Sequence, residues 1–141
     1  MVLTLLYTAN ARRAMTKILV VDDDQESRDL LCEVLETNGY APHAVADGQA
    51  AREVLNRDGE YHIVIADYQM PRESGLDLLR ILRQQNSKHE FILMSSFMSS
   101  GEKRAAKALG AHALLEKPFQ ITELLHTVGS LAADNSGGAA S

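Results

Sequence analysis

Acidic residues, one serine and one lysine stand just after short apolar runs of the chain, where they could act together. Asp22 and Asp23 follow the run KILVV, and Asp67 follows HIVIA. Ser95 follows FILM, and Lys117 comes two residues after ALL. Carboxylates that share a site repel one another unless a cation compensates them, and Mg²⁺ prefers oxygen ligands. Because a carboxylate can also attack a phosphoryl group, these residue types indicate phosphoryl transfer assisted by a divalent cation.

The apolar runs are typical of strands that are buried on both faces of a parallel sheet. They recur at 17–21, 41–45, 62–66, 91–94 and 113–115, and the second is the weakest. Segments with apolar residues at helical spacing lie between and after them, at 27–38, 49–57, 75–85, 102–109 and 121–131. Five strand–helix pairs without a hairpin signal predict an α/β fold, in which five helices cover both faces of a five-stranded parallel sheet.

Sites in open parallel sheets form beyond the carboxyl ends of the strands, where the strand order reverses. In a flavodoxin-like doubly wound sheet of order 2-1-3-4-5, the first and third strands are neighbours at that point. We therefore expect Asp22, Asp23 and Asp67 to lie close together. Ser95 and Lys117 would share the same rim, where a hydroxyl and an ammonium group could contact phosphoryl oxygens.

The composition of the 141-residue chain is typical of one globular domain, with 45% hydrophobic and 23% charged residues. A net charge of −5 disfavours a dedicated nucleic-acid-binding protein. The single cysteine, Cys32, excludes an intrachain disulfide and favours a reducing, cytoplasmic location. No apolar run reaches the ~18 residues of a membrane span, so no membrane association is expected.

The two ends of the chain differ in composition from the middle. Residues 1–15 predict a disordered extension, because their apolar part is short and their arginines follow it, the reverse of a secretory signal. Residues 132–141 are small, polar and glycine-rich, which predicts a flexible tail. Residues 16–131 remain as the folded domain.

Four segments in order resemble the receiver domain of bacterial two-component response regulators, of the kind that includes chemotaxis regulators: KILVVDDDQESRDLL, IVIADYQMPRESGLDLL, ILMSSF and GAHALLEKPF. The resemblance covers about residues 16–131. It implies that Asp67 is the phosphoacceptor and that Asp22 and Asp23 are the acidic pair that binds metal, with Asp23 the more direct ligand. It also implies that the chain is not a conventional enzyme but accepts a phosphoryl group on its own aspartate.

The resemblance implies further assignments at the same rim. Asp67 and the backbone carbonyl of Gln69 complete the ligands of Mg²⁺, with Mn²⁺ as the alternative ion. Ser95 and Lys117 contact the phosphoryl group, and the bond before Pro118 is cis. The donor is a sensor histidine kinase or phosphotransfer protein. A downstream target protein reads the face made by the fourth helix, the fifth strand and the fifth helix.

Two positions near the site distinguish this sequence within the family pattern. Leu114 departs from the pattern, and Gln69 bears on the lifetime of the phosphoryl group. The residue three before the lysine is often aromatic in the family, but here it is Leu114, so an aromatic side chain cannot report phosphorylation. Gln69 stands where the attacking water would approach, and its identity is expected to tune the phosphoryl lifetime. We expect the loop that contains Phe97 to carry the conformational change instead.

Three other interpretations compete with a signalling phosphoacceptor. A haloacid-dehalogenase-type enzyme also uses Asp, Ser or Thr and Lys, but it needs an acid where Gln69 stands. A flavodoxin-type carrier needs a phosphate-cradling loop after the first strand, where this chain has three aspartates. The chain could also be the receiver segment of a hybrid histidine kinase or multidomain regulator, acting as a phosphate relay.

Among the remaining polar residues, Asp24, Asp47 and Ser99 are predicted to cap helices or form turns rather than to react.

Overall fold

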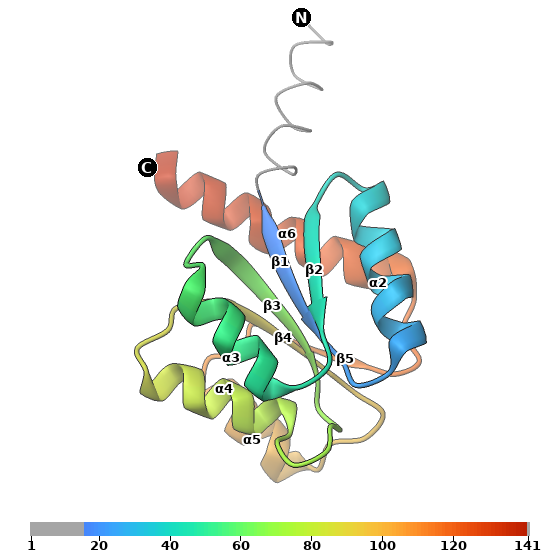
Figure 1. The fold of residues 1–141 in the computed structure, drawn as a ribbon, viewed down its shortest axis with the longest axis vertical. Coiled ribbons are helices and arrows are strands. Elements are labelled where there is room, and N and C mark those ends of the chain that lie inside the picture. The colour runs from blue at the N-terminus through green and yellow to red at the C-terminus, as the bar shows by residue number, and fades with distance from the viewer. Residues whose placement is uncertain (1–15, 141) are drawn as a thin grey trace, which may run out of the picture.

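The computed structural model describes residues 16–140, with side chains up to residue 133, and the extension predicted for residues 1–15 lies outside the described part. Strands and helices alternate along the chain (Figure 1): β1 (Lys17–Val21), α2 (Gln25–Thr37), β2 (Ala41–Val45), α3 (Gly48–Arg57), β3 (Tyr61–Asp67), α4 (Gly75–Gln84), β4 (Glu90–Ser95), α5 (Ser100–Ala108), β5 (Ala113–Glu116) and α6 (Ile121–Ala140).

All five strands are parallel and form one sheet of order β2-β1-β3-β4-β5. The predicted flavodoxin-like topology is therefore confirmed. In the register of β1 and β3, Val21 faces Ala66, and in that of β3 and β4, Asp67 faces Met94. The first and third strands consequently end side by side at the carboxyl edge of the sheet, which is the predicted point of strand-order reversal.

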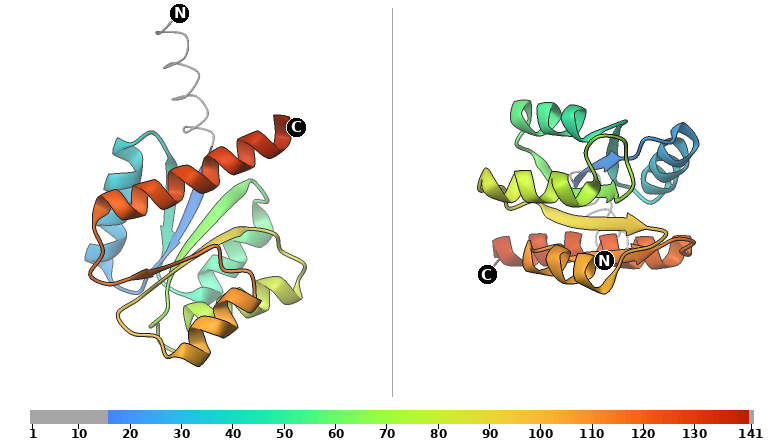
Figure 2. Two further views of the ribbon diagram at one scale, coloured as in Figure 1. Left: turned by 180° about the vertical axis from the view of Figure 1, so that it is seen from behind. Right: turned by 90° about the horizontal axis from the view of Figure 1, so that it is seen from below.

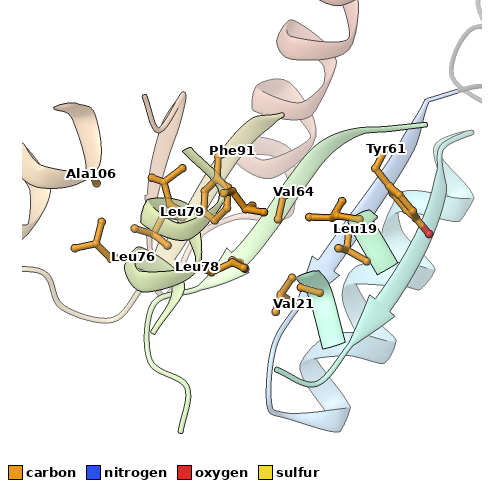
Figure 3. Close-up of a cluster of buried hydrophobic side chains, with 14 of the residues drawn as sticks. Leu19, Val21, Tyr61, Val64, Leu76, Leu78, Leu79, Phe91 and Ala106 are labelled. Carbon is orange, nitrogen blue, oxygen red and sulfur yellow. The ribbon is translucent and has the colours of Figure 1, made fainter. Parts of the chain in front are cut away.

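Successive side chains along each central strand enter two separate cores, because strand residues alternate between the faces of a sheet. Leu19, Val64 and Phe91 belong to the core under α3 and α4, which Figure 3 shows in close-up. Ile18 and Ile65 belong to the core that Leu35 of α2 and Leu124 of α6 complete. Figure 2 shows α6 crossing the second face of the sheet. Burial on both faces explains why the strands read as continuous apolar runs.

The helix ends follow the local chemistry of the sequence. Asp24, Asp47 and Ser99 are the N-caps of α2, α3 and α5, and each side chain accepts a backbone N–H from the first turn, as predicted. Gly39 and Gly110 follow α2 and α5 with φ of +89° and +85°, a conformation that favours glycine. These residues fix where the chain turns back toward the sheet.

The end of the chain differs from the prediction of a flexible tail over residues 132–141. Helix α6 does not stop at Leu131 but continues to Ala140. Ala132 lies against the core that contains Leu124 and Leu131, so the packed part of the helix extends past the predicted boundary.

Within the residues that the structure describes, no helix is both long and apolar enough to cross a membrane.

Candidate functional site

Three aspartates meet at the carboxyl edge of the sheet. Asp67 is the last residue of β3, and Asp22 is the next residue after β1, so the pairing of Val21 with Ala66 carries both acids to the same level. Asp23 stands beside them on the exposed side of the rim. One carboxylate oxygen from each acid lies within 4.8 Å of the others. The structure therefore brings together the three acids as the sequence predicts.

Asp22 is the most buried acid of this group, with 1% of the residue exposed. Its Oδ1 accepts the N–H of Asp24 at 2.9 Å, but its buried Oδ2 accepts no hydrogen bond, and the Nζ of Lys117 is 3.9 Å away. Burial raises the pKa of Asp22 above its usual range, and the charge of Asp67 adds to this, while the Asp24 amide and Lys117 act in the opposite direction. Asp22 thus carries a carboxylate oxygen with unused bonding capacity.

Asp67 is held from two sides. Its Oδ1 accepts the backbone N–H of Gln69 at 3.2 Å, and its Oδ2 lies 3.3 Å from the Nζ of Lys117. Lys117 is positioned in turn by its own backbone, because its N–H donates to the carbonyl of Ser95 at 2.8 Å. The bond between Lys117 and Pro118 is cis. A carboxylate and an ammonium group separated by 50 residues are consequently presented to each other at the rim.

The hydroxyl of Ser95 is not directed to Asp67. Ser95 ends β4 with 3% of the residue exposed, and its Oγ donates to the carbonyl of Phe97 at 2.7 Å while accepting the N–H of Phe97 at 3.0 Å. Both bonds tie the hydroxyl to the loop before α5. Donation from the Ser95 hydroxyl to a group on Asp67 therefore requires its bond to the carbonyl of Phe97 to be given up.

Gly75 allows α4 to begin directly against the end of β3. A Cβ at this position would lie 2.4 Å from the carbonyl oxygen of Asp67 and 2.7 Å from Cδ1 of Leu93. Ser74 caps the helix in a capping box with Asp77, so the chain enters α4 in a fixed direction. A residue with a side chain at position 75 would push the loop and Asp67 apart.

Sequence reasoning missed two contributions near the site. The guanidinium of Arg28 on α2 donates to the carbonyl of Asp22 at 2.7 Å. Glu73, in the loop after Asp67, forms an ion pair with Arg52 on α3. The second contact joins residues 21 positions apart on different elements. No local spacing could have revealed it, because it depends on how α3 and the loop pack.

The donor set fits a hard divalent cation. Its members are carboxylate oxygens from Asp22, Asp23 and Asp67, and the buried Oδ2 of Asp22 has no hydrogen-bond donor. Mg²⁺ is typically bound by one or two carboxylates together with phosphate oxygens and water. Aspartates after β1 would repel a phosphate that arrived without a cation, which argues against a flavodoxin-type phosphate loop at this strand end.

Comparisons with known proteins agree with this arrangement. A family model, the response regulator receiver domain, matches residues 18–129. The transcriptional regulatory protein CpxR of Escherichia coli is 34% identical over 117 residues, which are 83% of this chain and 49% of that protein. The response regulator MprA of Mycobacterium leprae is 36% identical over 115 residues, or 82% and 50%. The chain thus spans about half the length of these curated relatives.

Solved structures share the fold. The receiver domain of the Francisella response regulator 1452 has a TM-score of 0.80 and 32% identity, covering 85% of this chain and 98% of that one. The Vibrio cholerae chemotaxis protein CheY4 has a TM-score of 0.77 and 28% identity, covering 83% and 98%. The sequence, the sheet topology and the acidic rim all agree with these comparisons. The chain belongs to the family of response regulator receiver domains, a module of two-component signalling.

Proposed function

We propose that Asp67 accepts a phosphoryl group from a histidine kinase or phosphotransfer protein in a Mg²⁺-dependent reaction, and that phosphorylation changes a partner-binding surface. The arrangement of Asp67 carries this proposal. Its carboxylate lies 3.3 Å from the Nζ of Lys117, and carboxylate oxygens of Asp22 and Asp23 lie within 4.8 Å of it. A nucleophile, a cationic group and a place for a metal ion therefore converge on one carboxylate.

In the proposed transfer, a carboxylate oxygen of Asp67 forms a bond to phosphorus as the bond between phosphorus and the donor imidazole nitrogen breaks. The N–H of Gln69 fixes the orientation of the carboxylate, and Lys117 offsets negative charge on the transferred oxygens. Asp22, Asp23, Asp67 and the backbone carbonyl of Gln69 would hold Mg²⁺ or Mn²⁺, which supplies positive charge against the acids and the phosphoryl oxygens.

The donor must bring its phosphorylated histidine to this rim, and an open hollow borders the site there. The hollow has a volume of about 390 Å³, and its walls include Asp22 and Lys117 together with Leu30 of α2 and Ile121 of α6. Leu30 is 53% exposed and Ile121 is 37% exposed. Apolar side chains exposed beside an ionic site suit a protein donor that covers them as it presents its histidine.

The output surface is expected to lie over α5, β5 and α6. Helix α5 is weakly anchored, since Ala106 is its buried residue. The loop before it carries Phe97, which is 72% exposed. The backbone N–H and the backbone carbonyl of Phe97 are both hydrogen-bonded to the Ser95 hydroxyl. A phosphoryl group that attracted the Ser95 hydroxyl would release this loop. Lys103 links α5 to β5 through its ion pair with Glu116, so a shift of the loop would be felt on this face.

Phosphorylation with labelled acetyl phosphate tests the transfer itself. The unmodified protein with Mg²⁺ should acquire acid-labile label, whereas Asp67→Asn and protein treated with EDTA should acquire none. Asp47→Asn is the matched control, because it makes the same chemical change at a helix cap, which asparagine also satisfies. Undiminished label on Asp67→Asn or without metal would contradict the proposal.

A phosphate mimic tests the surface change. NMR shifts recorded with and without beryllofluoride should extend from the rim to Phe97 and to residues of α5 and β5. The same measurement on Ser95→Ala should lose the shifts on α5 while keeping those around Asp67. If beryllofluoride shifts only the loops of Asp23 and Asp67 in the protein without a substitution, the proposed surface change is contradicted. Phosphate relay would then be the role that is left.

A further inference from the structure

The loop between β3 and α4, residues 68–74, is tied to α3 by an ion pair. Arg52 Nη1 donates to Glu73 Oε1, and the two side chains are 26% and 21% exposed. The same loop carries Gln69, whose N–H holds Oδ1 of Asp67. Helix α3 contributes none of the predicted site residues, yet it is linked through Glu73 to the loop that orients the phosphoacceptor.

Glu73 occupies a place that only a glycine on α3 leaves free. Gly48 is the buried first residue of α3, and a Cβ on it would lie 2.0 Å from Oε2 of Glu73. That Oε2 is buried and accepts no hydrogen bond. The guanidinium of Arg52 is therefore the positive charge that compensates this carboxylate, and removing it leaves a poorly solvated charge behind.

The middle of the loop needs such support. Its two ends are fixed by backbone hydrogen bonds, from the N–H of Tyr68 to the carbonyl of Met94 at 2.7 Å and from the N–H of Gly75 to the carbonyl of Tyr68 at 3.0 Å. Between them Arg72 has φ of +68°, which is uncommon for a residue with a Cβ. Conformations of this kind persist where the surroundings hold them, and the next residue is Glu73.

We propose that Arg52 and Glu73 are positioning residues for phosphoryl transfer. By holding the middle of the loop against α3, they fix the backbone at Gln69, whose N–H orients Asp67 and whose carbonyl is the proposed metal ligand. This inference rests on the proposed function, and neither side chain touches the reacting atoms. Groups that orient metal ligands from outside typically change metal affinity by ~10–100-fold when they are removed.

Mg²⁺ affinity by calorimetry and the initial rate of phosphorylation by acetyl phosphate provide the test. Glu73→Gln and Arg52→Met should each raise the Kd for Mg²⁺ about tenfold and slow phosphorylation at limiting Mg²⁺. The double variant should be no worse than either single one, because both changes break the same contact. Arg52→Lys, which keeps the charge, should recover most of the Mg²⁺ affinity. The losses of affinity in the other variants should occur without a fall in the melting temperature of the metal-free protein. A purely structural role predicts instead that affinity and melting temperature fall together.

Gly48→Ala provides a second route that removes neither charge. The added methyl group would displace the Glu73 carboxylate, so Mg²⁺ affinity should fall as in Glu73→Gln. In the background of Glu73→Ala the same substitution should have no further effect, because the atom it collides with is gone. Alanine is a better helix former than glycine, so α3 itself should fold.

The outcomes separate the two proposals. If the unmodified protein neither binds Mg²⁺ nor accepts a phosphoryl group, the proposed function is wrong. If it does both while Glu73→Gln, Arg52→Met and Gly48→Ala all match it, the positioning inference is overturned. Arg80→Ala is the control, because it removes an exposed ion pair with Asp77 on the neighbouring helix and should change neither quantity.

Discussion

The amino and carboxyl edges of the sheet differ in how the chain satisfies a charged side chain: Arg83 is half-buried at the first and Asp22 is buried at the second. At the amino edge of β4 and β5, the guanidinium of Arg83 donates to the backbone carbonyls of Leu109, Ser87 and His89 at 2.8 to 3.0 Å, and to that of Gly110 at 3.3 Å. At the carboxyl edge, Asp22 is nearly inaccessible, yet its Oδ2 accepts no hydrogen bond.

This difference separates a structural charge from a functional one. Arg83 joins the end of α4, the entry to β4 and the turn after α5, and its donors are used by the chain itself. The carboxyl edge instead holds an excess of acceptors, since three carboxylates meet there and Lys117 pairs with two of them, Asp22 and Asp67. Charge left uncompensated within a fold costs stability, and it is available for a ligand that supplies the missing charge.

The largest effect is expected at the amino edge. Arg83→Ala should lower the free energy of unfolding by about 3 kcal/mol, because it leaves several backbone carbonyls without their charged donor. Urea denaturation measures this loss. The folded fraction of Arg83→Ala should keep the Mg²⁺ affinity of the protein without a substitution, because the two edges lie at opposite ends of the strands. Arg80→Ala, at an exposed pair, should change stability by less than about 0.5 kcal/mol.

Mg²⁺ should produce the next largest effect, at the other edge. At about 100 times its Kd the ion should stabilise the unmodified protein by about 2.7 kcal/mol, because it binds the folded acids and not the dispersed ones. Thermal denaturation with and without Mg²⁺ measures this gain. Asp23→Asn should lose most of it, whereas an equal gain in Asp23→Asn would place the ion elsewhere.

Removing the buried charge of Asp22 should change stability less than Arg83→Ala does, and in the opposite direction. In the absence of metal, Asp22→Asn should raise the free energy of unfolding at neutral pH by about 1 kcal/mol, because it removes a buried charge while its carbonyl can still accept the N–H of Asp24. Stability lost in metal-free Asp22→Asn would show that Lys117 already compensates this carboxylate.

The smallest effect concerns pH at the amino edge. Burial lowers the pKa of His89, and the charges of Arg83 and His62 lower it further. The folded protein therefore prefers neutral His89, so this stabilisation is present above the ordinary histidine pKa of ~6.5 and is lost as pH falls through the lower folded value. His89→Asn should reduce the fall in stability below pH ~6.5, as measured by urea denaturation over a series of pH values. If the free energy of unfolding of His89→Asn depends on pH as it does in the protein without a substitution, His89 does not contribute to the pH dependence.

Much of the fold and the acidic rim could be predicted from local sequence. Apolar runs of strand length alternate with segments of helical period, and a parallel sheet follows because no run is joined to the next by a hairpin turn. The positions of Asp22 and Asp67 one step past paired strand residues then bring the acids together. These features depend on period and register, which short stretches of sequence carry.

The tertiary structure alone decided the contacts between elements. The pairing of Arg52 with Glu73 and the bond from Arg83 to the carbonyl of Leu109 join segments whose spacing along the chain has no period. The close approach of Gly75 to Asp67 and the contact of Ala132 with the core beyond Leu131 likewise came from packing. Local propensity fixes which elements form, but distances between their side chains are set only when the helices dock on the sheet.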